Sequence, residues 1–166
     1  ITGLIFAKWS KQSWVVRNTE ELLKYSRNIK TPKIVIKPIS QSGGKGVFII
    51  PKSKMREIRF KEELLIQEFI DSSQGVPEVS HGMHDLRLVF VNKKIVYAYI
   101  RQPKKGSYLA NLAQGGNLQI VPKNKLPGSL GPIVRYANEV FASYEPRVFT
   151  IDLMFDKKRR PWIVEL

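Results

Sequence analysis

The chain has 166 residues, enough for one well-buried domain or for two small lobes that share a cleft. Its 28 Lys and Arg outnumber its 14 Asp and Glu, and the net charge of +14 favours anionic partners such as nucleotides, nucleic acid or acidic peptides. Cysteine is absent, which excludes disulfides and thiolate metal sites. No apolar run approaches the ~20 residues that a membrane-spanning helix needs. We therefore expect a soluble, cytoplasmic protein with no membrane partner.

The first predicted elements are a short strand and a helix. Trp14-Val15-Val16 predicts the strand. Asn18, followed three residues later by Glu21, has the pattern of a capping box and predicts a helix over 19–28. Thr31-Pro32 ends that helix, because the residue before a proline disfavours helical backbone angles.

A glycine-rich loop follows, between apolar runs over 34–36 and 47–50 that predict two strands. The loop carries lysines on both sides, Lys37 and Lys45. Glycine lets successive backbone N–H groups turn toward one ligand and leaves no Cβ in the way, so such a loop suits a phosphate chain. It is not a Walker loop, because no Gly-Lys-Ser/Thr opens a helix after it. An ordinary link between two strands is the alternative interpretation.

The middle of the chain indicates a basic segment, a strand and a loop. Residues 52–61 are rich in Lys and Arg, which indicates a solvated face or, alternatively, a polyanion site. An apolar strand over 64–70 precedes a loop over 71–84 that glycine and proline punctuate. His81 and His84 lie in that loop without the carboxylate pattern of a zinc site, so we interpret both as loop residues.

Residues 86–91 and 95–101 form a predicted hairpin around Asn92-Lys93-Lys94. Arg87 and Arg101 lie near its strand ends, where charges more often belong to a solvated rim than to a functional site.

A polar loop over 102–117 and a helix over 129–143 complete this part of the chain. Apolar residues at 3.6-residue spacing predict the buried stripe of that helix: Ile133, Val134, Ala137, Val140 and Phe141.

The last hairpin carries two carboxylates. Apolar runs over 148–155 and 161–166 flank a polar link that can only be a turn. If the turn centres between Lys158 and Arg159, Asp152 lies opposite Glu165. The same register places Met154 and Ile163 on the carboxylate face and pairs, on the other face, Phe155 with Trp162, Leu153 with Val164 and Ile151 with Leu166.

Two opposed carboxylates in an apolar hairpin cost stability unless something neutralises them. A hard divalent cation does so, since Mg²⁺ in nucleotide sites is usually held by one or two carboxylates together with phosphates. Asp152 and Glu165 are therefore candidate Mg²⁺ ligands, with Mn²⁺ as an alternative ion. The other interpretation is that one of them faces solvent or pairs with a lysine.

Five motifs occur in order: a lysine before a glycine-rich loop, Gln-Glu-Phe-Ile at a strand end, Asp-x-Arg, Arg followed by Asn and Gly-Gly, and Asp and Glu across a hairpin. This order resembles the ATP-grasp superfamily, and it is most similar to carboxylate–amine ligases of the ribosomal-protein glutamate ligase type. The similarity runs from about Thr19 to the end. It implies an α+β fold in which two lobes, each with an antiparallel sheet and helices, clamp ATP. We assign residues 1–70 to the first lobe and residues 71–166 to the second, truncated lobe.

The resemblance also implies roles for single residues. Lys37 contacts the nucleotide phosphates and, with Arg101 near the reacting carboxylate, is a candidate catalytic residue. Asp85 lies near the ribose, and Asp152 and Glu165 are two of three metal ligands. A flap over the phosphates, which orders when nucleotide binds, is formed by Ser42, Gly43, Gly44, Lys45 and Gly46. The linker that contacts adenine consists of Gln67, Glu68, Phe69 and Ile70. Asn111 is the asparagine at the phosphate end.

The implied reaction joins a carboxylate to an amine. The carboxylate attacks the γ-phosphoryl group of ATP to give an acylphosphate, and the amine then displaces phosphate, so catalysis is chiefly positioning and charge neutralisation. The expected partners are ATP, a small-molecule or peptide carboxylate, and an amine acceptor. The basic surface favours an acidic acceptor. Phosphotransfer by the same clamp is one alternative. A basic module that holds nucleic acid is another, but it leaves the opposed carboxylates unexplained.

Three departures from the family pattern concern completeness and substrate. The chain starts without Met and ends in an apolar run, so we expect a fragment that lacks the family's N-terminal domain and oligomerises, if at all, through missing regions. The family's third metal ligand, an asparagine two residues after the glutamate, would lie beyond Leu166. Leu109 and Gln114 stand where the glutamate ligases carry basic residues, and the loop over 71–84 is longer, which leaves the substrate open.

Overall fold

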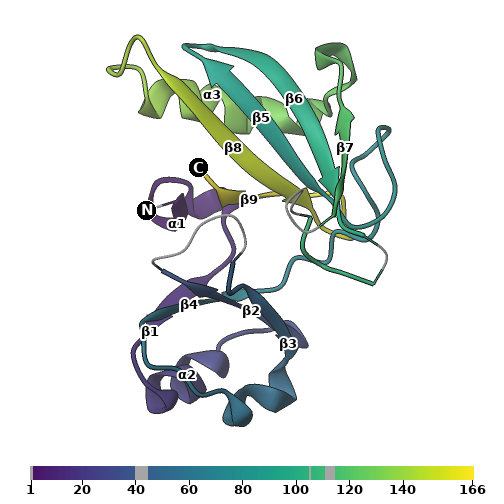
Figure 1. Ribbon diagram of the computed structural model, residues 1–166. Coiled ribbons are helices and arrows are strands. Elements are labelled where there is room, and N and C mark those ends of the chain that lie inside the picture. Colours follow the sequence, from purple (N-terminus) through teal and green to yellow (C-terminus); the bar gives the residue numbers. More distant parts are fainter. Residues whose placement is uncertain (1, 40–44, 105, 111–114) are drawn as a thin grey trace. The chain divides into compact units, whose positions relative to one another are not determined.

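The computed structural model describes residues 2–39, 45–104, 106–110 and 115–166. The chain divides into two compact units, one of residues 11–69 and the other of residues 1–10 and 70–166. Each unit contains one antiparallel sheet with helices (Figure 1), which confirms the predicted α+β class. No helix in the described part of the chain is long and apolar enough to cross a membrane.

The unit of residues 11–69 is a four-stranded sheet with the order β1-β4-β2-β3. Its strands are β1 (Ser13–Val16), β2 (Lys33–Pro38), β3 (Phe48–Pro51) and β4 (Leu64–Glu68), and its helices are α2 (Thr19–Ser26) and the 3-10 helix η2 (Lys52–Glu57). Helix α2 begins where the sequence predicts, because the Asn18 side chain accepts a hydrogen bond of 2.8 Å from the Glu21 backbone N–H.

Both helices of this unit contribute to a core on one side of its sheet. Leu22 of α2 and Met55 of η2 are buried against apolar residues of the strands, including Ile34 and Ile36 of β2. Side chains alternate along a strand, so Lys37 of β2 points from the opposite face. Gln67 of β4 is the cross-strand partner of Val35, so it shares the face of Lys37, away from the helices, whereas Glu68 is the partner of the core residue Ile34.

The other unit is a five-stranded sheet with the order β7-β6-β5-β8-β9. Its strands are β5 (Asp85–Val91), β6 (Lys94–Gln102), β7 (Asn117–Ile120), β8 (Val148–Phe155) and β9 (Pro161–Glu165). Its helices are α1 (Thr2–Ile5), η1 (Ala7–Trp9), η4 (Lys123–Lys125), η5 (Gly128–Leu130) and α3 (Gly131–Val140). The sequence analysis missed β7, whose four residues are all exposed and carry no buried apolar face.

Helix α3 covers one face of this second sheet (Figure 1). Its buried residues Ile133 and Ala137 pack in one core with Leu86 and Leu88 of β5. Every second residue of β5 is buried, from Leu86 to Phe90, whereas the residues between them are not. Arg87 and its alternate neighbours therefore lie on the face of the sheet opposite α3.

Residues 1–10 belong to this second unit, whereas we assigned them to the first lobe. Phe6 is fully buried in the core beneath α3, and its ring centroid lies 5.5 Å from that of Tyr136. Ser10 forms a parallel β-bridge with Ile163 of β9. The mixed apolar and basic residues at the start of the chain do not show which sheet this segment covers.

Candidate functional site

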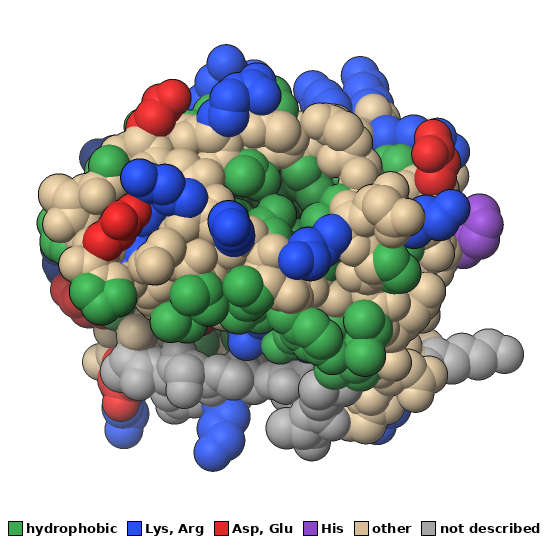
Figure 2. Space-filling view, turned by 90° about the horizontal axis from the view of Figure 1, so that it is seen from above, with side chains coloured by type: hydrophobic (Ala, Val, Ile, Leu, Met, Phe, Trp, Pro, Cys, Tyr) green, Lys and Arg blue, Asp and Glu red, His purple; other side chains and the backbone are tan. Residues whose placement is uncertain are grey.

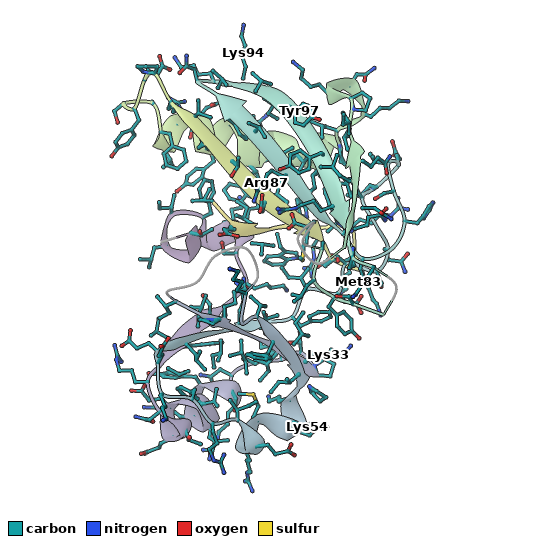
Figure 3. The ribbon with its side chains drawn as sticks, in the orientation of Figure 1. Lys33, Lys54, Met83, Arg87, Lys94 and Tyr97 are labelled. Atoms are coloured by element: carbon teal, nitrogen blue, oxygen red, sulfur yellow. The ribbon has the colours of Figure 1, made fainter. Side chains whose placement is uncertain are left out.

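Four charged side chains meet on the sheet face opposite α3, where Figure 3 labels Arg87. The Nε and Nη2 atoms of Arg87 donate to Oδ1 and Oδ2 of Asp152, each over 2.6 Å. Arg101 Nη2 donates to Oδ2 of Asp152 over 2.7 Å and to Oδ2 of Asp85 over 2.6 Å. The Asp152 side chain is only 3% exposed. One carboxylate thus binds two guanidinium groups, and one guanidinium group binds two carboxylates.

Strand register explains why these groups meet. Arg87 of β5 is the cross-strand partner of Asp152 of β8, and Asp85 of β5 is the partner of Arg101 of β6. Glu165 of β9 is the partner of Asp152 on its other side, which confirms the predicted opposition of the two carboxylates. Direct partners in an antiparallel sheet project from the same face, so all five side chains belong to one surface.

The turn of the last hairpin differs from the one we predicted. Asp156 N–H donates to Arg160 O over 3.0 Å, Arg159 N–H donates to Asp156 O over 2.8 Å, and Arg159 has a left-handed φ of 59°. These features give a three-residue loop centred on Lys158, where we expected a turn centred between Lys158 and Arg159. The Asp156 carboxylate stabilises this loop by accepting hydrogen bonds from the Lys158 and Arg160 N–H groups.

The strand pairs next to the turn are consequently one residue away from the predicted ones. Phe155 pairs with Pro161, Met154 with Trp162 and Leu153 with Ile163. Ile163 is 1% exposed and lies in the core beneath α3, so its predicted place on the carboxylate face was wrong. The register then shifts between Asp152 and Leu153, which leaves Val164 as an extra residue and puts Glu165 opposite Asp152.

Burial and mutual charge set the ionisation of the cluster. Burial and the neighbouring Asp152 carboxylate raise the pKa of Asp85 to about 7, although Arg101 acts in the opposite direction. Burial lowers the pKa of Arg101, but the carboxylates of Asp85 and Asp152 outweigh that effect and raise it overall. The hydrogen bonds that Arg87 donates to the Asp152 carboxylate raise the pKa of Arg87. Both arginines therefore stay charged, and the buried carboxyl of Asp85 takes up a proton far more readily than an exposed aspartate does.

Two atoms of the cluster retain unused hydrogen-bonding capacity. Oδ1 of Asp85 and Nε of Arg101 are buried and have no hydrogen-bond partner in the described part of the chain. A buried acceptor and a buried donor without partners each cost free energy until a ligand group or a water satisfies them.

The residues present fit a hard divalent cation. Asp152 and Glu165 project from the same face of adjacent strands, and oxygen ligands of this kind are those that Mg²⁺ prefers. No group of three or more His, Asp or Glu that could hold a metal occurs within the described ranges. The two carboxylates thus supply part of a coordination shell, which phosphates and water complete in nucleotide sites. The neutralising partners of Asp152 are arginines, an alternative that the sequence analysis did not consider.

In the unit of residues 11–69, two predicted nucleotide-binding residues lie together. Lys37 Nζ of β2 donates to Oε1 of Gln67 of β4 over 3.1 Å. On the same face, Lys33 Nζ lies 5.3 Å from the ring centroid of Phe69. The charge of Lys33 and the ring of Phe69 therefore lie on the same face as Lys37 and Gln67. Such a face can bind an anionic group next to a planar aromatic group.

The other linker residues have structural partners as well. Glu68 Oε1 accepts the Lys30 backbone N–H over 3.0 Å, and the Phe69 N–H donates to Thr31 Oγ1 over 3.2 Å. Ile70 is 5% exposed and begins the long segment of the other unit.

The predicted flap is only partly described. Lys45 and Gly46 form a turn just before β3, and Gly46 has a φ of 68°, which glycine adopts without a Cβ clash. Ser42, Gly43, Gly44 and Asn111 lie outside the described residues, so their proposed roles stay predictions.

Comparison with known protein families decides the family. The RimK-like ATP-grasp domain matches residues 7–166. The chain belongs to the RimK-like ATP-grasp family.

The relatives of this ATP-grasp domain include named ligases. A probable alpha-L-glutamate ligase of Vibrio vulnificus (strain YJ016) is 30% identical over 105 residues, which are 60% of this chain and 32% of that protein. A glutathione synthetase of Buchnera aphidicola subsp. Schizaphis graminum (strain Sg) is 30% identical over 137 residues, which are 78% of this chain and 42% of that protein. The chain thus spans less than half the length of these relatives.

Solved ATP-grasp structures share the fold at low identity. The ATP-grasp ligase PsnB, complexed with minimal precursor, Mg and ADP, has a TM-score of 0.66 and 10% identity, over 99% of this chain and 47% of that one. The D-cycloserine synthetase DcsG has a TM-score of 0.63 and 13% identity, over 99% of this chain and 59% of that one.

Sequence reasoning on this ATP-grasp domain identified most members of the charged cluster but missed the role of Arg87. We interpreted Arg87 as one of the strand-end charges, whereas it binds Asp152 through two hydrogen bonds. The alternation of the strand puts Asp85 and Arg87 on one face, but it does not show that Asp152 of β8 lies across from Arg87.

Proposed function

We propose that this ATP-grasp domain binds Mg·ATP and contributes to the ATP-dependent ligation of a carboxylate to an amine. The observation that carries the proposal is the cross-strand pair of Asp152 and Glu165 beside two arginines on one sheet face. The family supports it, because relatives that match this chain are named as ligases. Arg87 and Arg101 are held by internal carboxylates, so a surface built to grip nucleic acid is less well supported.

The reaction has two steps. A carboxylate oxygen attacks the γ-phosphorus of ATP, the bond to the bridging oxygen breaks, and ADP leaves with that electron pair. The amine nitrogen then attacks the acyl carbon, and phosphate leaves as the amine loses a proton. Neither step needs a side-chain nucleophile, so the protein's part is orientation and charge neutralisation.

Each proposed role follows from a local property of its residue. Lys37 supplies charge to the nucleotide phosphates, and Arg101, with its unpartnered buried Nε, binds the reacting carboxylate. The unpartnered Oδ1 of Asp85 accepts a hydrogen bond from a ribose hydroxyl. Mg²⁺, with Mn²⁺ as the alternative, is held by Asp152 and Glu165 and neutralises phosphate charge.

The proposed carboxylate belongs to a small molecule or a peptide, and the acceptor amine to an acidic partner. Figure 2 shows Lys and Arg side chains spread around a group of hydrophobic ones, with fewer acidic side chains among them. That surface and the net charge of +14 favour an acidic acceptor. PsnB, which shares the fold, was also solved with precursor peptide PsnA2 and AMPPNP. We further propose a cytoplasmic location, where ATP is abundant.

A phosphate-release screen tests the proposal. The chain is incubated with Mg·ATP, a panel of amino-acid and peptide carboxylates, and hydroxylamine, which traps an acylphosphate as a hydroxamate. We expect ADP, phosphate and a hydroxamate that depend on one class of carboxylate and disappear in Lys37→Met. A stable phosphorylated product without amide would indicate phosphotransfer. Absence of both products, together with nucleic-acid binding that weakens steeply with salt, would indicate the polyanion-binding alternative.

A further inference from the structure

We propose that Arg87 is a resident counter-cation of Asp152 that a divalent metal displaces, and that the released guanidinium group then binds an anionic group of the nucleotide or substrate. This inference rests on the proposed function, because it concerns the same metal ligand. It assigns a binding role to a residue that the motif analysis left as a strand-end charge.

The first step of the argument is the occupancy of the Asp152 carboxylate. Arg87 donates to both oxygens in the forked geometry of a bidentate pair, and Arg101 donates to Oδ2 as well. A carboxylate offers about four lone-pair positions, and three are used here. A divalent cation that takes one oxygen also brings its charge close to a guanidinium group at 2.6 Å from that carboxylate. Metal and Arg87 therefore compete for Asp152.

The second step identifies which arginine is displaced. Arg101 is held by two carboxylates, since its Nη2 also lies 2.6 Å from Asp85, and its side chain is 13% exposed. Within the part of the chain that the structure describes, Arg87 has Asp152 as its carboxylate partner, and its side chain is 27% exposed. Displacement of Arg87 thus breaks fewer ion pairs and moves a group that already reaches solvent.

The third step concerns the destination of the released group. A guanidinium group removed from its carboxylate retains five donors and a charge that does not titrate, so it seeks another planar or phosphate anion. Arg87 starts on the same face as the proposed metal ligands, directly across the strands from Asp152. A metal-bound phosphate or carboxylate at Asp152 and Glu165 lies within reach of a side chain of this length. The exchange therefore couples metal entry to anion binding.

The test measures metal affinity without nucleotide, by electron paramagnetic resonance of free Mn²⁺ against the intact chain, Arg87→Gln, Asp152→Asn and Arg135→Gln. Arg135 is the matched control, because it is an exposed arginine of α3, on the other side of the same sheet. We expect Arg87→Gln to bind Mn²⁺ about ten-fold more tightly, a factor typical of coupled sites. Arg135→Gln should not change the affinity, and Asp152→Asn should lose binding.

A second titration distinguishes competition from a structural role. With saturating Mn²⁺, Arg87→Gln should bind ATP more weakly than the intact chain, so one substitution changes metal and nucleotide affinity in opposite directions. Arg87→Lys, which keeps the charge but not the fork, should fall between the two.

The possible failures are distinguishable. If Asp152→Asn loses Mn²⁺ but Arg87→Gln binds it no more tightly than the intact chain, the exchange is overturned and the metal site stands. If neither the intact chain nor Arg87→Gln binds Mn²⁺, with or without ATP, the metal assignment and the exchange are both overturned. Circular dichroism of every variant excludes unfolding as the cause.

Discussion

Asp152 and Glu165 are direct cross-strand partners, although the strand pairs nearest the turn follow a register that differs by one residue. The three-residue loop pairs Leu153 with Ile163, and continued pairing at that register would set Asp152 opposite Val164. The extra residue shifts the pairing, so Ile163 enters the core while Glu165 joins Asp152 on the opposite face. The hairpin thereby packs an apolar face against the core on the α3 side and presents the carboxylate pair on the opposite face of the sheet.

Removal of the Asp152 charge should destabilise the fold. Asp152→Asn leaves Arg87 without its carboxylate partner and Arg101 with one instead of two. Breaking a buried pair in this way costs about 3 kcal/mol of unfolding free energy. Urea denaturation measures this cost. Asp71→Asn is the control, because its ion pair with Lys157 is 40% and 62% exposed and should contribute less than ~1 kcal/mol.

Asp85 should make stability fall as pH rises. Its folded-state pKa of about 7 exceeds the unfolded value near 3.8, so its contribution favours folding fully below pH ~4 and is lost as pH approaches 7. Asp85→Asn removes this dependence, and the difference from the unsubstituted chain can reach about 4 kcal/mol between those limits. Urea denaturation at about pH 3.5 and about pH 7.5, which lie below the unfolded-state pKa and above the folded-state pKa, measures this difference. An unchanged pH dependence in Asp85→Asn would contradict the assignment.

The elements and the candidate residues were largely predictable from the sequence, because alternation and capping are local. The Asn18 cap, the apolar stripe of α3 and the opposed carboxylates were all confirmed. The cap and the stripe depend on residues at most a few positions apart. The carboxylate pair was predicted from a turn centred between Lys158 and Arg159, whereas a three-residue loop followed by a register shift produces it.

The ion pairs were not predictable, because they depend on one irregularity of register and on one long-range strand pairing. A simple two-residue turn at Asn92-Lys93 would set Asp85 opposite Ile100, and a shift between Val89 and Phe90 puts it opposite Arg101 instead. The pairing of β5 with β8, separated by about sixty residues of sequence, then sets Arg87 beside Asp152. No local pattern contains either fact.

His84 should titrate below its ordinary pKa. It is 1% exposed, its Nε2 accepts the Phe155 N–H over 3.0 Å, and its Nδ1 lies 3.1 Å from Ser72 O, so the neutral ring carries its proton on Nδ1. Burial lowers the pKa of His84 despite the backbone hydrogen bonds. Its stabilising contribution is therefore full above about pH 6.5 and is lost as pH falls. NMR titration of the ring protons should give a midpoint below that of a free histidine, and a higher midpoint would refute the assignment.

Gly75 should be intolerant of a side chain. It has a φ of 84°, and a Cβ added there would lie 2.0 Å from Ser80 O. Gly75→Ala should therefore cost well over ~1 kcal/mol, since it adds a backbone clash to the strain of a left-handed conformation. Gly82→Ala is the matched control, because φ is 86° but the nearest atom is 3.9 Å away. Equal melting temperatures for the two variants would show that the clash is relieved.

The most direct test of the central claim, that Asp152 and Glu165 hold the metal of bound ATP, is calorimetric titration of ATP with and without Mg²⁺. The intact chain should bind ATP at least about ten-fold more tightly with Mg²⁺ than without it, a difference of about 1.4 kcal/mol. Asp152→Asn and Glu165→Gln should lose that gain, and Arg135→Gln should keep it. ATP binding that is equal in the two conditions, or absent from both, would contradict the account.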